Sequence, residues 1–230
     1  MKNHSFRRLR IRLVGWNWSG FFSNFTAVVL GIVITFVGSD LLQEHATQRD
    51  IKEMMQLIKT ELVANRAEVV SAQEWYLNQR RVASYILSNE GNYQRDTLNM
   101  YSPLVFQLIS VESTNDALDM LKVSGLMQKI AKKEHVMQII KAYRCIDSTV
   151  NGIQSFRNMK EDAFARLSAD KAFLTFDGSK FDNVGKWNFY IQLPVMHQLL
   201  ETIITYWFGN PFDDDIAAID EAIAAIEKAD

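Results

Sequence analysis

The sequence predicts an all-α protein in which an N-terminal transmembrane helix continues into the first long helix of an extramembrane helical bundle. Three observations support this fold class: a charge-free run at residues 13–39, apolar residues at helical spacing over most of the remainder, and only three prolines in 230 residues. A β-sandwich would need turn residues about every 8–12 positions. The three prolines and the six glycines beyond the apolar run are too few for that architecture.

Residues 21–42 are predicted to form the transmembrane helix. A spanning helix needs about 20 mostly apolar residues to cross a hydrocarbon core about 30 Å thick. Within residues 25–37 only Thr26 and Thr35 carry polar side chains. Lipid cannot pair backbone amides, so this β-branched stretch must still be helical. A cleaved signal peptide is the alternative, because Val37-Gly38-Ser39 resembles a cleavage site, but the apolar run exceeds the usual signal length.

Residues 1–20 are predicted to be a basic cytoplasmic segment, since they hold five basic and no acidic residues. The positive-inside rule then places residues 43–230 on the other side of the membrane. A bacterial inner membrane with a periplasmic domain fits this orientation. Basic and indole side chains favour the headgroup level, so the predicted membrane-surface residues are Arg7, Arg8, Arg10, Arg12, Trp16 and Trp18.

Small side chains recur at every fourth position of the apolar run: Ser23, Ala27, Gly31, Thr35 and Ser39. Lipid offers helices no hydrophobic drive to associate, so membrane helices pack where small residues let their backbones approach. This stripe predicts a helix-packing face. Its partner would be a second copy, giving a homo-oligomer, or another envelope membrane protein. Small residues are also common in membrane helices generally, and that is the competing interpretation.

The predicted ectodomain is acidic and lacks a disulfide. The chain has 25 basic and 27 acidic residues, and removing residues 1–20 leaves 20 basic against 27 acidic, a net charge of −7. Nucleic-acid binding would demand a basic surface, so nucleic acid is not an expected partner. Cys145 is the only cysteine, so no intramolecular disulfide can form. A small buried helical residue is the favoured interpretation of Cys145.

Periodicity and helix-end signals predict several ectodomain helices. Glu90-Gly91-Asn92 ends the first, Ser102-Pro103 is predicted to start the second, and Ser124-Gly125 stops the third. The expected ranges are residues 41–88, 102–111, 113–124, 132–168, 194–208 and 213–226. Residues 170–192 break this pattern, and they predict either a small irregular hairpin or a loop packed by its aromatic side chains.

No catalytic, cofactor or metal-binding signature is present. The four histidines are scattered, and none has a second histidine or cysteine at ligand spacing. No glycine-rich phosphate loop, nucleophile elbow or HExxH motif occurs. We therefore predict a non-enzymatic protein without cofactor or metal. Glu61 and Asn65, one turn apart, predict a polar contact inside the bundle. The aromatic residues of 187–208 predict core packing or, alternatively, an apolar groove.

Short segments resemble a family of small bacterial membrane proteins with one N-terminal span and a helical ectodomain, a domain of unknown function. The similar parts are Leu30-Gly31-Ile32, Glu61-Leu62-Val63-Ala64-Asn65 and residues 116–125 followed by Leu126. The resemblance implies this topology and fold. It transfers no functional residue, because no activity is established for the family.

Two functions remain open at this point. The first is a single-pass inner-membrane protein whose ectodomain mediates protein–protein interaction or oligomeric assembly in the cell envelope. The alternative is a sensory ectodomain that binds a small molecule. Only about 20 residues would face the cytoplasm, so a sensor would have to signal through a membrane partner. An envelope enzyme is the third and least favoured possibility.

Overall fold

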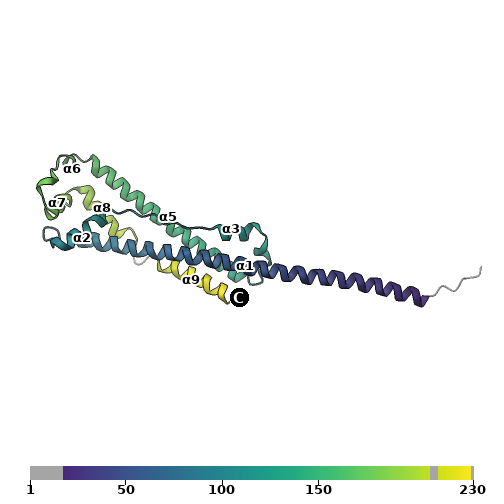
Figure 1. Cartoon of the computed structure of the whole chain (residues 1–230). Coiled ribbons are helices and arrows are strands. Elements are labelled where there is room, and N and C mark those ends of the chain that lie inside the picture. Colours follow the sequence, from purple (N-terminus) through teal and green to yellow (C-terminus); the bar gives the residue numbers. More distant parts are fainter. Residues whose placement is uncertain (1–17, 208–211, 229–230) are drawn as a thin grey trace, which may run out of the picture. The chain divides into compact units, whose positions relative to one another are not determined.

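The computed structural model describes residues 18–207 and 212–228, with the side chains of residues 18–24 and 37–40 outside that description. Every described element is helical and no strand occurs among these residues, which confirms the all-α prediction (Figure 1). The chain divides into two compact units, the first ending at Asp50 and the second comprising Ile51–Asp230. The helices are α1 (Trp18–Ser88), α2 (Arg95–Val105), α3 (Asp116–Val123), α4 (Leu126–Lys129), α5 (Lys133–Ala169), α6 (Lys171–Thr175), η1 (Gly178–Lys180), α7 (Asn183–Tyr190), α8 (Pro194–Thr205) and α9 (Asp213–Glu227).

Helix α1 has 71 residues, and no proline interrupts it. It ends at Ser88, just before Gly91, which has a φ of 75°. Only glycine adopts that left-handed conformation readily, so the predicted helix end is confirmed. In the first unit, residues 25–36 are all exposed. The N-terminal part of α1 is long and apolar enough to cross a membrane, judged by length and composition.

The second unit is built on α1, α5 and α9. Glu61 pairs with Tyr143, and Gln79 pairs with Lys160, so α5 runs parallel to α1 at a nearly constant offset. Helix α9 runs antiparallel to both. Its first turn binds Gln73 through Asp213 (2.9 Å), its middle binds Arg66 through Asp220 (2.5 Å), and its end binds Lys59 through Glu227 (2.8 Å).

Apolar side chains from every major helix fill the space between them. The positions that α1 contributes recur at helical spacing and are fully enclosed: Ile58, Leu62, Val69, Tyr76, Val82 and Ile86. Each such side chain stabilises the fold by about 1.5–3 kcal/mol relative to an exposed position. The isoleucines of α9 differ in burial, with Ile219 and Ile226 buried and Ile216 and Ile223 half-buried.

The prediction that Ser102-Pro103 starts a helix is wrong. Helix α2 begins at Arg95 and contains Pro103 in its last turn. Proline cannot donate the backbone bond of that turn and ends the helix soon after. The Ser102 hydroxyl instead donates to the Leu98 carbonyl. Residues 107–115 then form irregular chain, and Lys160 Nζ donates to the Gln107 carbonyl within it (2.7 Å).

Of the two alternatives predicted for residues 170–192, the small hairpin is wrong, and the physical reason is helix capping. Asp170 accepts from the amides of Ala172 (2.8 Å) and Phe173 (3.1 Å), and Asp182 accepts from the Gly185 amide (2.9 Å). Aspartates at such positions satisfy the orphan donors of a helix start, so the segment forms short helices α6, η1 and α7. Its aromatic rings do pack together, with Phe176 and Phe189 stacked at 3.8 Å.

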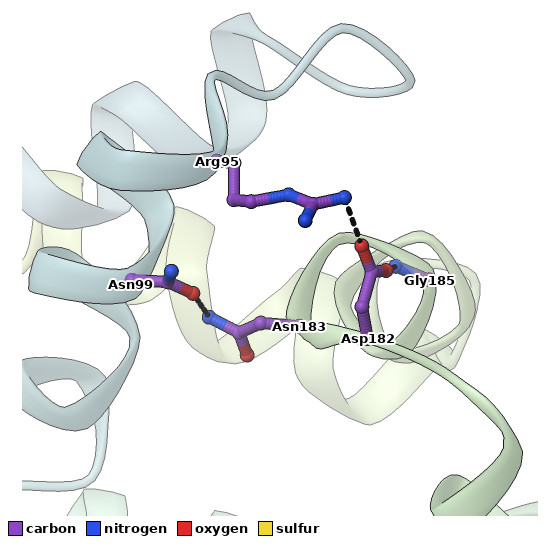
Figure 2. Close-up of polar contacts among 5 residues, drawn as sticks. All are labelled: Arg95, Asn99, Asp182, Asn183 and Gly185. Atoms are coloured by element: carbon purple, nitrogen blue, oxygen red, sulfur yellow. Dashed lines mark hydrogen bonds and ion pairs between the residues drawn. The ribbon is translucent and has the colours of Figure 1, made fainter.

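Helix α7 is held against α2 by polar contacts, as Figure 2 shows. Asp182 accepts from Arg95 Nη2 (2.9 Å) with one oxygen and caps α7 with the other. Asn183 Nδ2 donates to Asn99 Oδ1 (2.9 Å). One aspartate thus both starts a helix and docks it on a neighbour.

The remaining predicted helices are present with shifted ends. Gly125, with φ 72°, separates α3 from the short α4, and Pro194 opens α8 as predicted. Three aspartates occupy the first turn of α9, where negative charge is favourable beside the positive end of a helix.

Candidate functional site

The predicted helix-packing face lies open in the first unit. Ala27, Gly31 and Thr35 are exposed, and a Cβ placed at Gly31 would meet no heavy atom within 4 Å. The Thr35 hydroxyl donates to the Gly31 carbonyl (2.7 Å), so its polarity is satisfied within the helix. Ser23 and Ser39 belong to α1, but their side chains fall outside the described set.

The predicted membrane-surface residues fall outside the described part of the chain. This holds for Arg7, Arg8, Arg10, Arg12 and Trp16. Trp18 is the first residue of α1, and its side chain also lies outside the description. The membrane-surface role of all six stays a prediction.

Glu61 and Asn65 do make polar contacts inside the bundle, as the sequence predicted. Glu61 accepts from the Tyr143 hydroxyl and from the Ala117 amide (3.1 Å). Asn65 holds both backbone groups of Thr114, donating to its carbonyl (2.8 Å) and accepting from its amide (3.1 Å). We call these five residues the polar latch, because they fix the start of α3 against α1 and α5.

Burial and the hydrogen bond to Glu61 raise the pKa of the Tyr143 hydroxyl well above its usual value. The hydroxyl therefore stays protonated and acts as a permanent donor to the carboxylate. Asn65 is 3% exposed, so loss of either of its bonds would leave a buried polar group unpaired. This arrangement positions chain segments, and it contains no nucleophile beside a base.

Lys160 is the most unusual buried group in the second unit. Its side chain is fully enclosed, and its Nζ donates to Gln79 Oε1 (2.8 Å) and to the Gln107 carbonyl (2.7 Å). The Nζ also lies 5.4 Å from the ring centre of Trp75 and 5.8 Å from that of Phe164. Burial lowers the pKa of Lys160 to about 7. No carboxylate binds this amine among the described residues.

Sequence reasoning missed Lys160, although a signal was present. The buried stripe of α5 continues through Ile153, Phe156, Lys160, Ala163 and Leu167. A lysine at an apolar position of such a stripe must be buried or must break the helix face. The partner Gln107 could not be read from the sequence, because it lies in irregular chain after α2.

The aromatic region at residues 187–208 separates into two clusters, so its rings do not share one groove. Trp207 stacks on Phe156 at 5.5 Å and meets Tyr76 edge-on at 4.5 Å. Trp187 is buried and meets Tyr190 edge-on at 5.8 Å. Phe208 lies outside the described residues. The described rings pack on one another, as ordinary core side chains do.

The described residues contain no group of three or more His, Cys, Asp or Glu side chains that could hold a metal ion. Cys145 is half-buried in α5, and burial followed by a hydrogen bond to Asp215 raises its pKa to about 11. Its thiol is thus protonated near neutral pH and weakly nucleophilic.

An open cleft of about 590 Å³ lies at the end of the second unit where α1 stops. Its walls include Glu90, Gln192, His197 and Glu201. Glu90 accepts from Gln192 Nε2 (2.5 Å), and His197 Nδ1 lies 3.7 Å from Glu201 Oε2. Two carboxylates therefore face solvent at its rim.

Comparison of the chain with protein-family models, with curated proteins and with solved structures gives no match. The resemblance to a family of bacterial single-pass proteins accordingly stays a prediction, and function is argued from the residues alone.

Proposed function

We propose that this chain is a non-enzymatic single-pass membrane protein whose helical ectodomain mediates protein–protein interaction or oligomeric assembly in the cell envelope. The observation that carries the proposal is the exposure of residues 25–36. Their large apolar side chains are 40% to 68% exposed, and burying each one is worth about 1.5–3 kcal/mol. A continuous apolar surface of this kind marks a membrane or partner contact.

Charge asymmetry supports one orientation for this anchor. The five basic residues before it favour an N-terminus in a bacterial cytoplasm and a second unit in the periplasm. Membrane lipid is then the first partner of the chain.

The small-residue face supports association of the anchor with another helix. This face carries small side chains at Ala27, Gly31 and Thr35. The open space at Gly31 leaves room for the backbone of a second helix. Packing between membrane helices relies on such close approach. A second copy or another envelope membrane protein would fill this face.

The test is the assembly state of the full chain in mild detergent, measured by native mass spectrometry and by subunit-exchange fluorescence. We expect wild-type protein to form a defined complex and Gly31→Ile to shift it toward monomer, because the added side chain blocks backbone approach. Thr26→Ile is the matched control, since Thr26 lies about 140° around the helix from Gly31. A wild-type chain that is strictly monomeric, or equal behaviour of the two variants, would overturn the packing face.

A sensory role is the second candidate, and the cleft beside Glu90 and Glu201 favours it. Two exposed carboxylates suit a small organic cation. A thermal-shift screen of such cations on the full chain tests this role, since a ligand at 100 times its Kd adds about 2.7 kcal/mol of stability. Any stabilisation should vanish in Glu90→Gln/Glu201→Gln if the cleft is the binding site. A screen without a cleft-dependent shift would remove this candidate.

A further inference from the structure

A basic turn joins α3 to α5 in a unit that is otherwise acidic. We use this name for residues 120–133, which include Lys122, Lys129, Lys132 and Lys133 and no acidic residue. Lys122 pairs with Asp119 (2.8 Å). Lys133 Nζ donates to the carbonyls of Met127 (3.4 Å) and Gln128 (2.6 Å). Lys129 and Lys132 are exposed and make no hydrogen bond or ion pair with the described residues.

The same turn exposes apolar side chains beside these lysines. Val123 is 84% exposed and Met120 is 50% exposed, although Leu121 between them is buried. The backbone supports this display, because Gly125 in its left-handed conformation turns the chain from α3 into α4. Apolar side chains flanked by lysines are the composition of segments that rest on membrane surfaces.

Helix register places the basic turn at the end of the second unit where the chain enters it. Tyr143 contacts Glu61 and Lys160 contacts Gln79. Neighbouring positions of α5 and α1 therefore differ by 82 and 81 in residue number. Applied to the start of α5, the same offset puts Lys133 level with Ile51. Figure 1 shows α3 and the start of α5 at the same end of the bundle as the C-terminal end of α9.

Covalent connection limits how far that end can be from the predicted membrane segment. Residues 42–51 are helical, and nine residues of helix rise about 14 Å. The headgroup layer beyond the hydrocarbon core is itself about 5–8 Å thick on each side. Chain connectivity therefore allows the basic turn to approach the headgroup layer when the apolar helix spans the bilayer.

From these observations we infer that the basic turn binds the anionic phospholipid headgroups of the membrane that anchors the chain, with Val123 and Met120 inserted at the interface and Lys129 and Lys132 on phosphate oxygens. The inference rests on the proposed membrane anchor. Lys129 and Lys132 together should favour the bound state roughly 30-fold, since each cation near an anionic surface contributes roughly fivefold. Salt should weaken the attraction by screening.

Spin labels on the full chain in lipid nanodiscs test the inference. Cys145→Ser removes the native thiol, and the label is then attached through Val123→Cys or, as a control, through Leu174→Cys. Leu174 is 67% exposed and belongs to α6, which follows the far end of α5, about 55 Å along the bundle. In nanodiscs containing phosphatidylglycerol, we expect the label at position 123 to lose contact with a water-soluble nickel chelate and gain contact with oxygen. The label at position 174 should stay in water.

Charge-reversal variants test whether the lysines cause any shielding of the label at position 123 from the nickel chelate. Lys129→Glu/Lys132→Glu should return the label at position 123 to water, whereas Lys171→Glu/Lys180→Glu makes the same change of net charge in and beside α6 and should not. Protection that is equal in pure phosphatidylcholine or in detergent would indicate a protein contact and overturn the inference, as would a label at position 123 that stays in water. A label on Ile34→Cys reports the anchor separately. If position 34 lies in lipid and position 123 in water, only this inference fails; if position 34 lies in water, the proposed anchor fails as well.

Discussion

Lys160 makes the stability of the second unit depend on pH in a calculable way. In the folded chain its pKa is about 7, against an ordinary value of 10.5. Below about pH 7 the amine is charged in both states, and the full cost of burying the charge is present. Between about pH 7 and 10.5 the unfolded chain binds one more proton than the folded chain, so stability rises with pH. Replacing Lys160 with methionine should remove this dependence.

The shift sets the size of the effect. A full difference of 3.5 pKa units corresponds to about 5 kcal/mol, and the part between about pH 6.5 and about pH 9.5 is about 3 kcal/mol. Methionine also leaves Gln79 Oε1 and the Gln107 carbonyl without a donor, at about 1–3 kcal/mol for each buried acceptor. These costs do not vary over this pH range. The difference in unfolding free energy between wild type and Lys160→Met therefore tests the lowered pKa of Lys160 through its change with pH. The absolute value of that difference does not test it.

The assay is urea unfolding of full-length wild type and Lys160→Met in the same detergent at several pH values, followed by circular dichroism. We expect wild type to gain about 3 kcal/mol relative to the variant as pH rises from about 6.5 to about 9.5. Lys171→Met, which changes an exposed lysine, should run parallel to wild type. Parallel profiles for Lys160→Met and wild type would refute the assignment of a buried amine with a lowered pKa.

Further predictions concern the latch and two glycines. Glu61→Gln should cost about 1–3 kcal/mol in urea unfolding, because an amide cannot accept from both Tyr143 and Ala117. A double-mutant cycle with Tyr143→Phe should show coupling, and strictly additive costs would contradict the latch. Gly125→Ala should cost about 1–2 kcal/mol, since alanine resists the left-handed conformation, and an unchanged midpoint would contradict that backbone geometry. Gly152→Ala should destabilise the chain although alanine favours helix, because its Cβ would lie 3.0 Å from the Trp207 ring. Overpacking of this kind costs about 1–3 kcal/mol, and a stabilised variant with unchanged tryptophan fluorescence would count against it.

Sequence reasoning succeeded where a single local signal decides the structure. Gly91 and Gly125 marked helix ends, and the expected range of residues 132–168 agrees with α5 to within one residue at each end. The polar contacts of Glu61 and Asn65 were foreseen because two polar residues one turn apart interrupt an apolar face. The sequence could not predict their partners Thr114 and Ala117. Only tertiary packing brings residues about 50 positions apart into contact.

The failures arose where competing local signals had to be weighed. Asp177-Gly178 is typical of a hairpin turn, yet Asp170 and Asp182 cap helices on either side of it, and the short helices formed instead. Ser102-Pro103 is typical of a helix start, whereas Pro103 occupies the last turn of α2. Gly152 lies within α5, and its missing side chain is what admits the ring of Trp207.

The antiparallel docking of α9 has a consequence for synthesis. The ion pairs of Arg66 with Asp220 and of Lys59 with Glu227 join positions 154 and 168 residues apart, so the ribosome completes nearly the whole chain before α9 emerges. Such non-local pairing is slow to form and leaves apolar surface open to aggregation in the meantime. We expect nascent chains halted before Asp213 to be bound by chaperones or degraded, although all of α1 has by then been made.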